Sequence, residues 1–355
     1  MNDNNDPLLV IDSFSGEEVS QNRPTKRDLL DLFSHARSSA TPLFIAAPMV
    51  RYSKLPYRLL VRALNTQITY TPMMLAREFK NSAQARSSEF STCRSDRPLI
   101  AQFGASNSAD LLAAARIVAP YVSGIGINCG CPIRDQTALG IGAALMGRLD
   151  TLVDMVSTLK TALGEELLVE VKIRIHNDIE YTKQFVQELA GAGADVVSIH
   201  GRRIKDRSGV VPADLDAIRT LRSAIPEHVY LVANGDCFSL DDAYRIAKYT
   251  GADGIMAARG LLQNPALFTG AHITPWSAIE LYCAYVSAYG GNMKFQHVQL
   301  ALVEMTFGLL TKQERQLIRQ TRNLDQLYEF LNKYYILRRP GQEFFGTLTY
   351  SGFRR

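Results

Sequence analysis

The sequence predicts a (β/α)8 barrel, the TIM-barrel fold, followed by a small all-helical domain. Short apolar runs of strand length recur eight times between residues 41 and 270, and most are separated by segments with helical periodicity. This number of runs and this length of chain are typical of the barrel. A doubly wound sheet would usually carry a Gly-x-Gly-x-x-Gly turn after its first strand, but Ala47-Pro48-Met49-Val50 stands there instead.

The eight runs define the expected strands, and apolar runs of this length are typical of buried parallel strands. In order they are Leu43–Ala47, Ile68–Thr71, Leu99–Phe103, Ile125–Asn128, Leu167–Ile173, Val196–His200, Val229–Ala233 and Gly254–Ala257. Helical patterns between them are clearest at Ala109–Val118, Leu149–Leu163, Ile179–Ala190 and Leu240–Lys248. The barrel is therefore expected to span residues 41–272.

The segments on either side of the barrel have a different character. Residues 1–40 are acidic and lack sustained periodicity, so they predict a flexible lead-in with one helix near Lys26–Ala36. After Thr274-Pro275 the strand alternation stops. Helical stretches follow at Ile279–Ala288, Gln296–Leu309 and Leu324–Tyr334. Residues 273–355 are therefore expected to form a helical domain.

Composition narrows the class of protein. No apolar run approaches the roughly 20 residues that a membrane span needs, and the five cysteines lack the spacing of a disulfide framework. These features predict an intracellular protein, expected in the cytoplasm or the nucleus and without a membrane partner. The net charge is +4, and residues 276–355 are the most basic part per residue. A basic tail favours a polyanionic partner, although a solvated helix surface would show the same charge.

The carboxyl ends of the expected strands carry the polar residues, which is where a barrel builds its active site. Small residues at Asn234-Gly235-Asp236 and Ala258-Arg259-Gly260 follow the last two strands, whose loops commonly hold a phosphate. Lys172 and Gln102 lie within the fifth and third strands, and His200 ends the sixth. A phosphate grip, a lysine, a glutamine and a Pro48-Met49 shelf together suit flavin mononucleotide, FMN.

The segment Asn128-Cys129-Gly130-Cys131-Pro132 places two thiols at the end of the fourth strand. A zinc site usually needs four ligands with Cys-x2-4-Cys spacing, and the other three cysteines are isolated. We therefore expect no metal here. Cys129 is expected to be an apolar filler, and Cys93, Cys237 and Cys283 to be structural.

These motifs, in this order, resemble the tRNA-dihydrouridine synthase family, and the stretches beginning at Pro48 and Asn128 resemble most its eukaryotic subclass acting at tRNA positions 20a and 20b. The resemblance implies FMN as cofactor, NADPH as reductant and tRNA as substrate. It implies hydride transfer from the flavin N5 to C6 of uracil, and a proton from Cys131 to C5. The cofactor-binding residues that it implies are Pro48, Met49, Val50, Gln102, Lys172, His200, Asn234, Gly235, Asp236, Ala258 and Arg259. The substrate-binding residues are Asn128, Arg134, Arg202 and Arg203.

The assignment of Cys131 makes a structural prediction. A proton donor must keep its proton, and an unperturbed thiol does so at neutral pH because its pKa is about 8.5. A cation against the sulfur would lower that pKa, so Arg134 should point toward RNA and away from Cys131. Two other functions stay open at this stage: an FMN barrel enzyme acting on a small pyrimidine or enone, and a non-catalytic RNA-binding module. We expect the protein to be a monomer.

Overall fold

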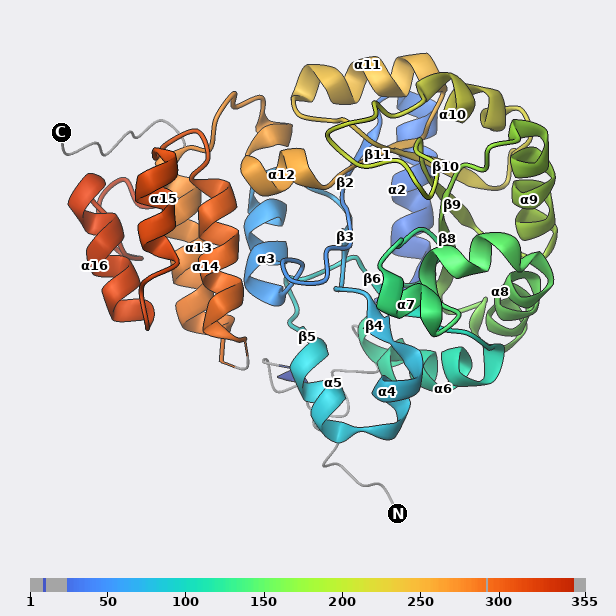
Figure 1. Cartoon of the computed structure of the whole chain (residues 1–355), viewed down its shortest axis with the longest axis horizontal. Helices are drawn as coiled ribbons and strands as arrows, with labels where there is room; N and C mark the ends of the chain where they lie inside the picture. The colour runs from blue at the N-terminus through green and yellow to red at the C-terminus, as the bar shows by residue number, and fades with distance from the viewer. Residues whose placement is uncertain (1–8, 11–23, 292, 348–355) are drawn as a thin grey trace.

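The computed structural model describes residues 9–10, 24–291 and 293–347, and it shows a closed parallel barrel with a helical domain at its side (Figure 1). The barrel strands pair in the order β2, β11, β10, β9, β8, β7, β6 and β3, and a parallel bridge between Ile45 and Ile68 closes the ring. Their bounds are β2 Leu43–Ala46, β3 Thr69–Tyr70, β6 Leu99–Gly104, β7 Gly124–Asn128, β8 Leu168–Arg174, β9 Val196–His200, β10 Tyr230–Asn234 and β11 Gly254–Ala257. The predicted (β/α)8 barrel is confirmed.

Helices cover the outside of this barrel. They are α3 Leu55–Ala63, α4 Ala76–Asn81, α5 Ala83–Glu89, α6 Ser108–Val118, α8 Leu149–Leu163, α9 Ile179–Gly191, α10 Leu215–Arg222 and α11 Leu240–Thr250. Shorter helices α7 Arg134–Ala138 and α12 Arg259–Gln263 follow β7 and β11, and the short strand β4 Met74–Leu75 pairs with β6. Two short strands, β1 Leu9–Val10 and β5 Ser91–Thr92, pair outside the barrel.

Alternation along β8 shows how the strands divide their side chains. Val169, Val171 and Ile173 belong to the core between strands and helices, whereas Leu168 belongs to the separate core inside the barrel. Because side chains alternate with a period of two, Glu170, Lys172 and Arg174 share the inward face with Leu168. The strand thus carries three ionisable side chains toward the barrel interior, in order from the floor to the mouth.

The floor of the barrel is closed by α2 Lys26–Ser39, which begins with a capping box made by Thr25 and Asp28. Leu29 and Phe33 are fully buried among the interior residues, and Phe33 stacks on Tyr230 at 4.8 Å between ring centroids. The helix that we predicted near Lys26–Ala36 is present as α2, but it belongs to the barrel and not to a flexible lead-in, because an open floor would expose the apolar interior. Residues 1–8 and 11–23 lie outside the described part.

The helical domain contains α13 Trp276–Tyr289, α14 Phe295–Met305, α15 Lys312–Ile318 and α16 Leu324–Tyr334. It lies against α3 on one side of the barrel (Figure 1). Tyr285 and Tyr289 of α13 pack on Leu55 and Leu59 of α3. Across the described residues, no helix has the length and apolar character that crossing a bilayer requires.

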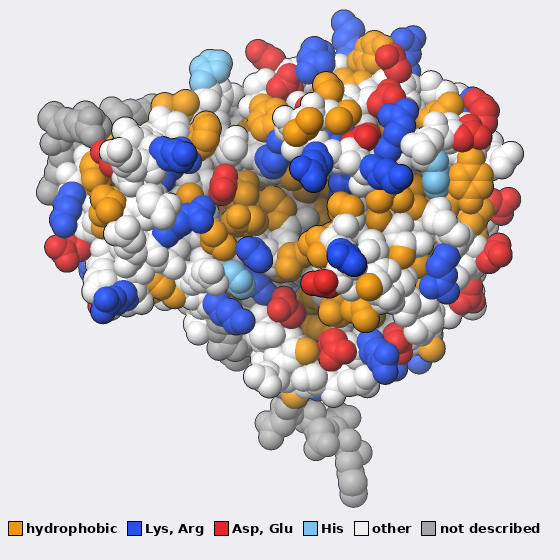
Figure 2. Space-filling view, in the orientation of Figure 1, with side chains coloured by type: hydrophobic (Ala, Val, Ile, Leu, Met, Phe, Trp, Pro, Cys, Tyr) orange, Lys and Arg blue, Asp and Glu red, His pale blue; other side chains and the backbone are white. Residues whose placement is uncertain are grey.

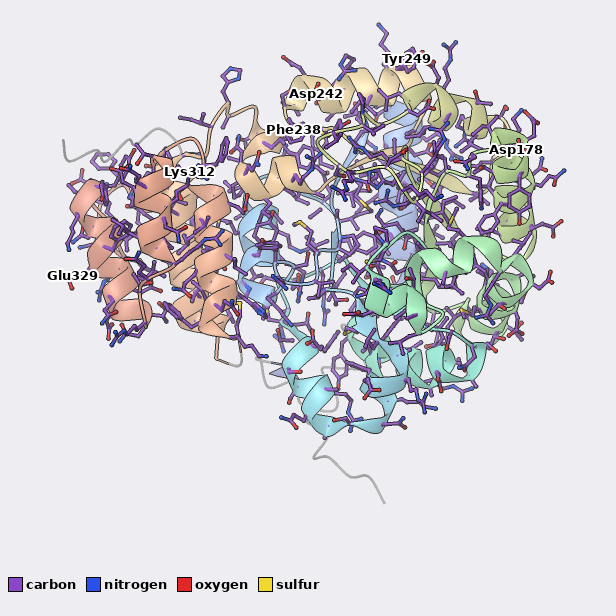
Figure 3. The ribbon with its side chains drawn as sticks, in the orientation of Figure 1. Asp178, Phe238, Asp242, Tyr249, Lys312 and Glu329 are labelled. Atoms are coloured by element: carbon purple, nitrogen blue, oxygen red, sulfur yellow. The ribbon has the colours of Figure 1, made fainter. Side chains whose placement is uncertain are left out.

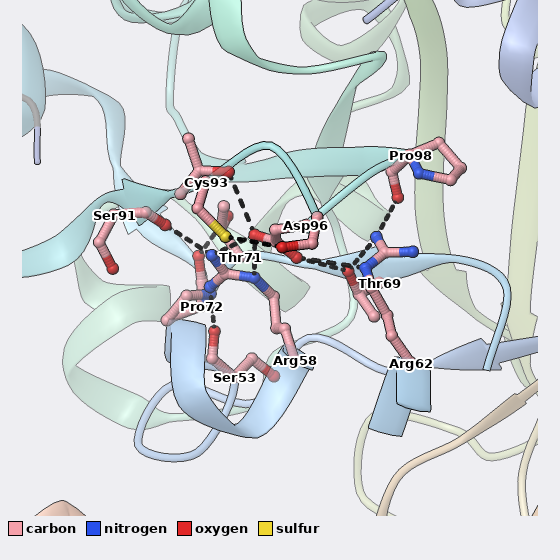
Figure 4. A network of polar contacts seen from close by, with 12 residues as sticks. Ser53, Arg58, Arg62, Thr69, Thr71, Pro72, Ser91, Cys93, Asp96 and Pro98 are labelled. Atoms are coloured by element: carbon pink, nitrogen blue, oxygen red, sulfur yellow. Dashed lines mark hydrogen bonds and ion pairs between the residues drawn. The ribbon is translucent and has the colours of Figure 1, made fainter. Parts of the chain in front are cut away.

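A buried polar network fixes α3 to the barrel (Figure 4). The carboxylate of Asp96, which is 0% exposed, accepts hydrogen bonds from Nε of Arg58 at 2.9 Å and from Nε of Arg62 at 3.3 Å. Arg58 also donates to the carbonyl of Ser53 at 2.7 Å. One carboxylate therefore holds two cations of α3, and one of these holds the loop that leads from β2 into the helix.

Candidate active site

The carboxyl ends of the strands open on one face of the molecule. In Figure 2 a hollow lined by hydrophobic side chains lies near the centre of that face, with lysine and arginine side chains around it. Pro48 and Met49 are half-buried in the loop after β2, and Val50 beside them is exposed. The three residues thus lie at the mouth, where the sequence analysis expected an apolar shelf.

The loop that carries Cys131 is held in place by the side chain of Asn128. Oδ1 of Asn128 accepts hydrogen bonds from the backbone N–H groups of Gly130 (3.3 Å) and Cys131 (3.1 Å), and its Nδ2 donates to Oε1 of Gln102 at 2.9 Å. The carbonyl of Cys131 accepts from the N–H of Ala143 at 2.8 Å. These contacts leave the thiol half-exposed at the mouth and show that Asn128 has a structural task in addition to any contact with a ligand.

The two thiols of this loop have different surroundings. Cys129 is fully buried, and burial raises its pKa well above the ordinary value, as suits the apolar filler that we predicted. Cys93, Cys237 and Cys283 are also buried, and none of them forms a disulfide with another described cysteine. Among the residues that the structure describes, no group of three or more His, Cys, Asp or Glu side chains could hold a metal ion.

Gln102 on β6 and Lys172 on β8 lie on the two strands that flank β7, which carries Asn128. The Nε2 of Gln102 is buried and has no hydrogen-bond partner within the described residues. Nζ of Lys172 donates to Oδ1 of Asn234 at 2.9 Å, and Nδ2 of Asn234 donates to the carbonyl of Met256 at 2.8 Å. Burial lowers the pKa of Lys172, while the carboxylate of Glu170 opposes that effect. An amide and an amine are therefore both presented at the barrel mouth.

The ends of β9, β10 and β11 enclose a cavity of about 110 Å³. Its lining includes His200, Asn234, Gly235, Asp236, Ala258 and Arg259. Gly235 has φ +135°, and a Cβ there would lie 2.6 Å from that of Ala213, so only glycine fits this turn. The guanidinium of Arg259, the first residue of α12, lies 5.2 Å from the ring centroid of Phe238, which stands in the loop before α11 (Figure 3).

Three charged side chains and a histidine organise this cavity. Asp236 accepts from Nη2 of both Arg202 and Arg259, the latter at 3.1 Å, and from the N–H of Ala213 at 2.8 Å. Burial acts to raise the pKa of Asp236, but the hydrogen bond from Arg202 and its other partners hold it below the usual value. Burial, followed by the nearby cations, lowers the pKa of His200 far enough to keep the imidazole neutral.

Arg202 differs from its predicted role. We expected it to contact tRNA, but its side chain is 2% exposed and its groups are engaged by Asp236, by His200 and, at 2.6 Å, by the carbonyl of Val211. Burial of this kind removes a guanidinium from an external phosphate, so Arg202 instead positions the two residues of the cavity wall. The sequence did not show this burial, because strand alternation and the turns near Arg202 do not reveal which side chains become enclosed.

Arg134 and Arg203 remain at the surface. Arg134 is exposed at the start of α7, and its guanidinium makes no hydrogen bond or ion pair within the described chain. The side chain of Arg203 is 40% exposed and lies 3.9 Å from Asp206 and 3.7 Å from Asp214. Arg174, which the sequence analysis did not single out, is the cation that holds the cysteine loop, because its Nε donates to the carbonyl of Gly130 at 2.7 Å.

The barrel, the cysteine loop and the anion-sized cavity define a family once they are compared with known proteins. The sequence profile of the dihydrouridine synthase (Dus) family matches residues 45–345, and the chain belongs to that family. The protein of Saccharomyces cerevisiae named tRNA-dihydrouridine(20a/20b) synthase [NAD(P)+] is 46% identical over 314 residues, which cover 87% of this chain and 84% of the relative.

The chain is also similar to an animal protein and to a fungal protein that is named for other tRNA positions. A human protein named tRNA-dihydrouridine(20a/20b) synthase [NAD(P)+]-like is 36% identical, covering 87% of this chain and 95% of the relative. A Schizosaccharomyces pombe protein named tRNA-dihydrouridine(16/17) synthase is 36% identical over 64% of this chain and 57% of its own length. Among solved structures, morphinone reductase superposes with a TM-score of 0.45 at 10% identity, covering 63% of this chain and 84% of that chain.

Proposed function

We propose that this protein reduces uridines at positions 20a and 20b of tRNA to 5,6-dihydrouridine, with FMN as cofactor and NADPH as reductant. The observation that carries the proposal is a half-exposed thiol, Cys131, on a braced loop at the barrel mouth, beside the groups that suit a flavin. The names of the fungal and human relatives supply the substrate.

The residues at the mouth fit FMN in three respects. Gln102 has a buried, unpartnered Nε2, which needs an acceptor such as the polar rim of a flavin ring. The Lys172 ammonium, on β8, donates to Asn234 at the end of β10 and suits an electron-rich edge. The cavity lined by His200, Gly235 and Arg259 has the neutral imidazole, close backbone approach and guanidinium that suit a phosphate.

When bound, FMN would supply a hydride, from its N5 to C6 of the uracil, after reduction by NADPH. The protein's part is to present a proton at the other carbon. Cys131 would donate it from sulfur to C5, and its loop is fixed by Asn128 and by the N–H of Ala143, so that little motion is needed at the moment of transfer. Lys172 and Gln102 would orient the ring system.

The substrate must leave its stack in folded tRNA to reach this site, at a cost of a few kcal/mol. Phosphate contacts from exposed cations can offset that cost. Arg134 and Arg203 stand on the loops around the mouth and are the candidates for this role.

The direct test is NADPH-driven reduction of tRNA that lacks dihydrouridine, followed by mapping of the product. We expect dihydrouridine at positions 20a and 20b, and no comparable turnover of free uridine nucleotides. Equal turnover of the free nucleotides would instead favour a small-molecule reductase. That the protein acts as a monomer, in the cytoplasm or nucleus, remains a prediction.

Substitutions of the adjacent residues Arg202 and Arg203 should have separate effects, one on FMN binding and the other on tRNA binding. Arg202→Ala removes the partner of Asp236 and His200, so we expect FMN affinity to fall about 10–100-fold, the worth of one or two hydrogen bonds to a charged group. Arg203→Ala should leave FMN affinity unchanged and reduce the salt dependence of tRNA binding by about one phosphate contact. Flavin fluorescence titration and tRNA binding at several salt concentrations measure both. The reverse pattern would contradict the assignment.

A further inference from the structure

Glu170 is a buried carboxylate that the proposed reaction does not use. It is 0% exposed on the inward face of β8, and neither of its oxygens has a hydrogen-bond partner of ordinary geometry among the described residues. A buried carboxylate that neighbouring hydroxyls approach only outside ordinary hydrogen-bond geometry costs free energy. The cost is not imposed by packing, because glutamine has the same shape. The charge of Glu170, and not its shape, is therefore the property that needs an explanation.

The space for this carboxylate is provided by Gly126 on the neighbouring strand β7. A Cβ on Gly126 would lie 2.6 Å from Oε2 of Glu170, so any larger residue there would displace the carboxylate. Burial raises the pKa of Glu170 to about 7, and the hydroxyl of Ser198 on β9, the charge of Lys172 and the hydroxyl of Tyr70 on β3 act to lower it. The interior of the barrel is therefore shaped around one acidic side chain.

Lys172 is the next inward residue along β8, toward the mouth. Burial lowers its pKa, Glu170 raises it, Arg174 lowers it again and Cys131 raises it. Its direct partner, Oδ1 of Asn234, is neutral. His200 is neutral, and the carboxylate of Asp236 is already engaged by two guanidinium groups. If Cys131 keeps its proton, as a proton donor must, Glu170 is the carboxylate left to balance Lys172.

We propose that Glu170 is a positioning residue whose buried carboxylate keeps the Lys172 ammonium charged at the barrel mouth. The inference rests on the proposed function for its significance, since a cation at that place favours the negative charge that a flavin gains on reduction. The charge coupling itself is a property of the protein alone. Glu170 acts through Lys172 and needs no contact with cofactor or substrate.

The test is the titration of Lys172 in the full-length protein without FMN. NMR of ¹³C-labelled lysine monitors the titration, and Lys172→Met identifies the Lys172 signal. Glu170→Gln should move the titration of Lys172 to lower pH by about one unit or more, the usual effect of removing one nearby opposite charge. Glu170→Asp keeps the charge and should stay within a fraction of a unit of the wild type. Glu165→Gln, an exposed residue just before β8, should change nothing.

A second measurement links the coupling to the cofactor. In the FMN-loaded protein, the flavin reduction potential is measured as a function of pH. The pH at which its slope becomes steeper should be lower in Glu170→Gln than in the wild type. It should be unchanged in Glu165→Gln. Thermal midpoints are recorded for both variants, because a loss of stability without a shifted titration would indicate a structural role alone.

The outcomes are distinguishable. An unchanged Lys172 titration in Glu170→Gln overturns the inference, as does a lower thermal midpoint with an unchanged titration, which would make Glu170 purely structural. A shifted titration in a wild-type protein that fails to reduce tRNA would support the charge coupling and refute the proposed function instead.

Discussion

Cys131→Ala should lose about 10²–10⁴-fold in the rate of tRNA reduction while retaining FMN. That range is the usual contribution of one positioned acid. The thiol is the half-exposed cysteine of the braced loop, and its removal leaves the hydrogen bonds of Lys172 to Asn234 and of Gln102 to Asn128 in place. The rate of dihydrouridine formation in a single turnover with pre-reduced enzyme, together with flavin absorbance, measures the two effects separately.

The control for this prediction is the neighbouring thiol. Cys129→Ala changes a fully buried residue of the core outside the barrel, so it should affect stability more than rate. A full rate in Cys131→Ala would show that another group supplies the proton. An equal loss in both variants would show that the loop conformation, and not the acid, had been tested.

Asp96→Ala should reduce the free energy of unfolding by about 3–5 kcal/mol, the usual effect of breaking a buried ion pair from one side. Arg58, which is 2% exposed, and Arg62 would both lose their carboxylate partner. Asp96 also accepts from the hydroxyl of Thr92 at 3.2 Å. The midpoint and slope of urea denaturation give the measured change.

An exposed ion pair provides the comparison. Arg27 and Asp31 lie 3.7 Å apart on α2, with side chains 87% and 71% exposed, so Asp31→Ala should cost at most about 0.5 kcal/mol. Because α3 carries both Arg58 and the surface on which α13 packs, Asp96→Ala should also loosen the helical domain. Similar stability losses in the two variants would show that the network in Figure 4 contributes little.

Much of the fold follows from local pattern. Each expected barrel strand is present to within about two residues at either end, because continuous apolar runs between helical segments have few other arrangements. The helix at Leu324–Tyr334 is present with the expected bounds. The expectation missed α15, although Thr311 and Glu314 form a capping box that the sequence displays. The short helices α4, α5 and α7 have only 6, 7 and 5 residues, too few to show a clear apolar period.

Some features of the site could also be predicted from the sequence, and others could not. The sequence placed Cys131, Gln102, Lys172 and Asn234 at strand ends, because the polarity of a parallel barrel brings all such ends to one face. It could not show that Asn128 braces the cysteine loop and bonds Gln102, since those partners are 26 residues apart. Nor could it show that Arg174 holds the carbonyl of Gly130.

By itself the sequence determined the barrel, the order of its polar strand ends and the family that they resemble, because these depend on periodicity and on residue type at strand ends. Only the tertiary structure decided which charges are buried. Arg202 and Arg203 are adjacent in the chain, yet one is enclosed by Asp236 and the other faces solvent. The carboxylate of Glu170 fits the interior only because Gly126 stands opposite it on the neighbouring strand β7. Burial depends on what distant strands place opposite a side chain, and it fixes both the pKa and the partners of that side chain.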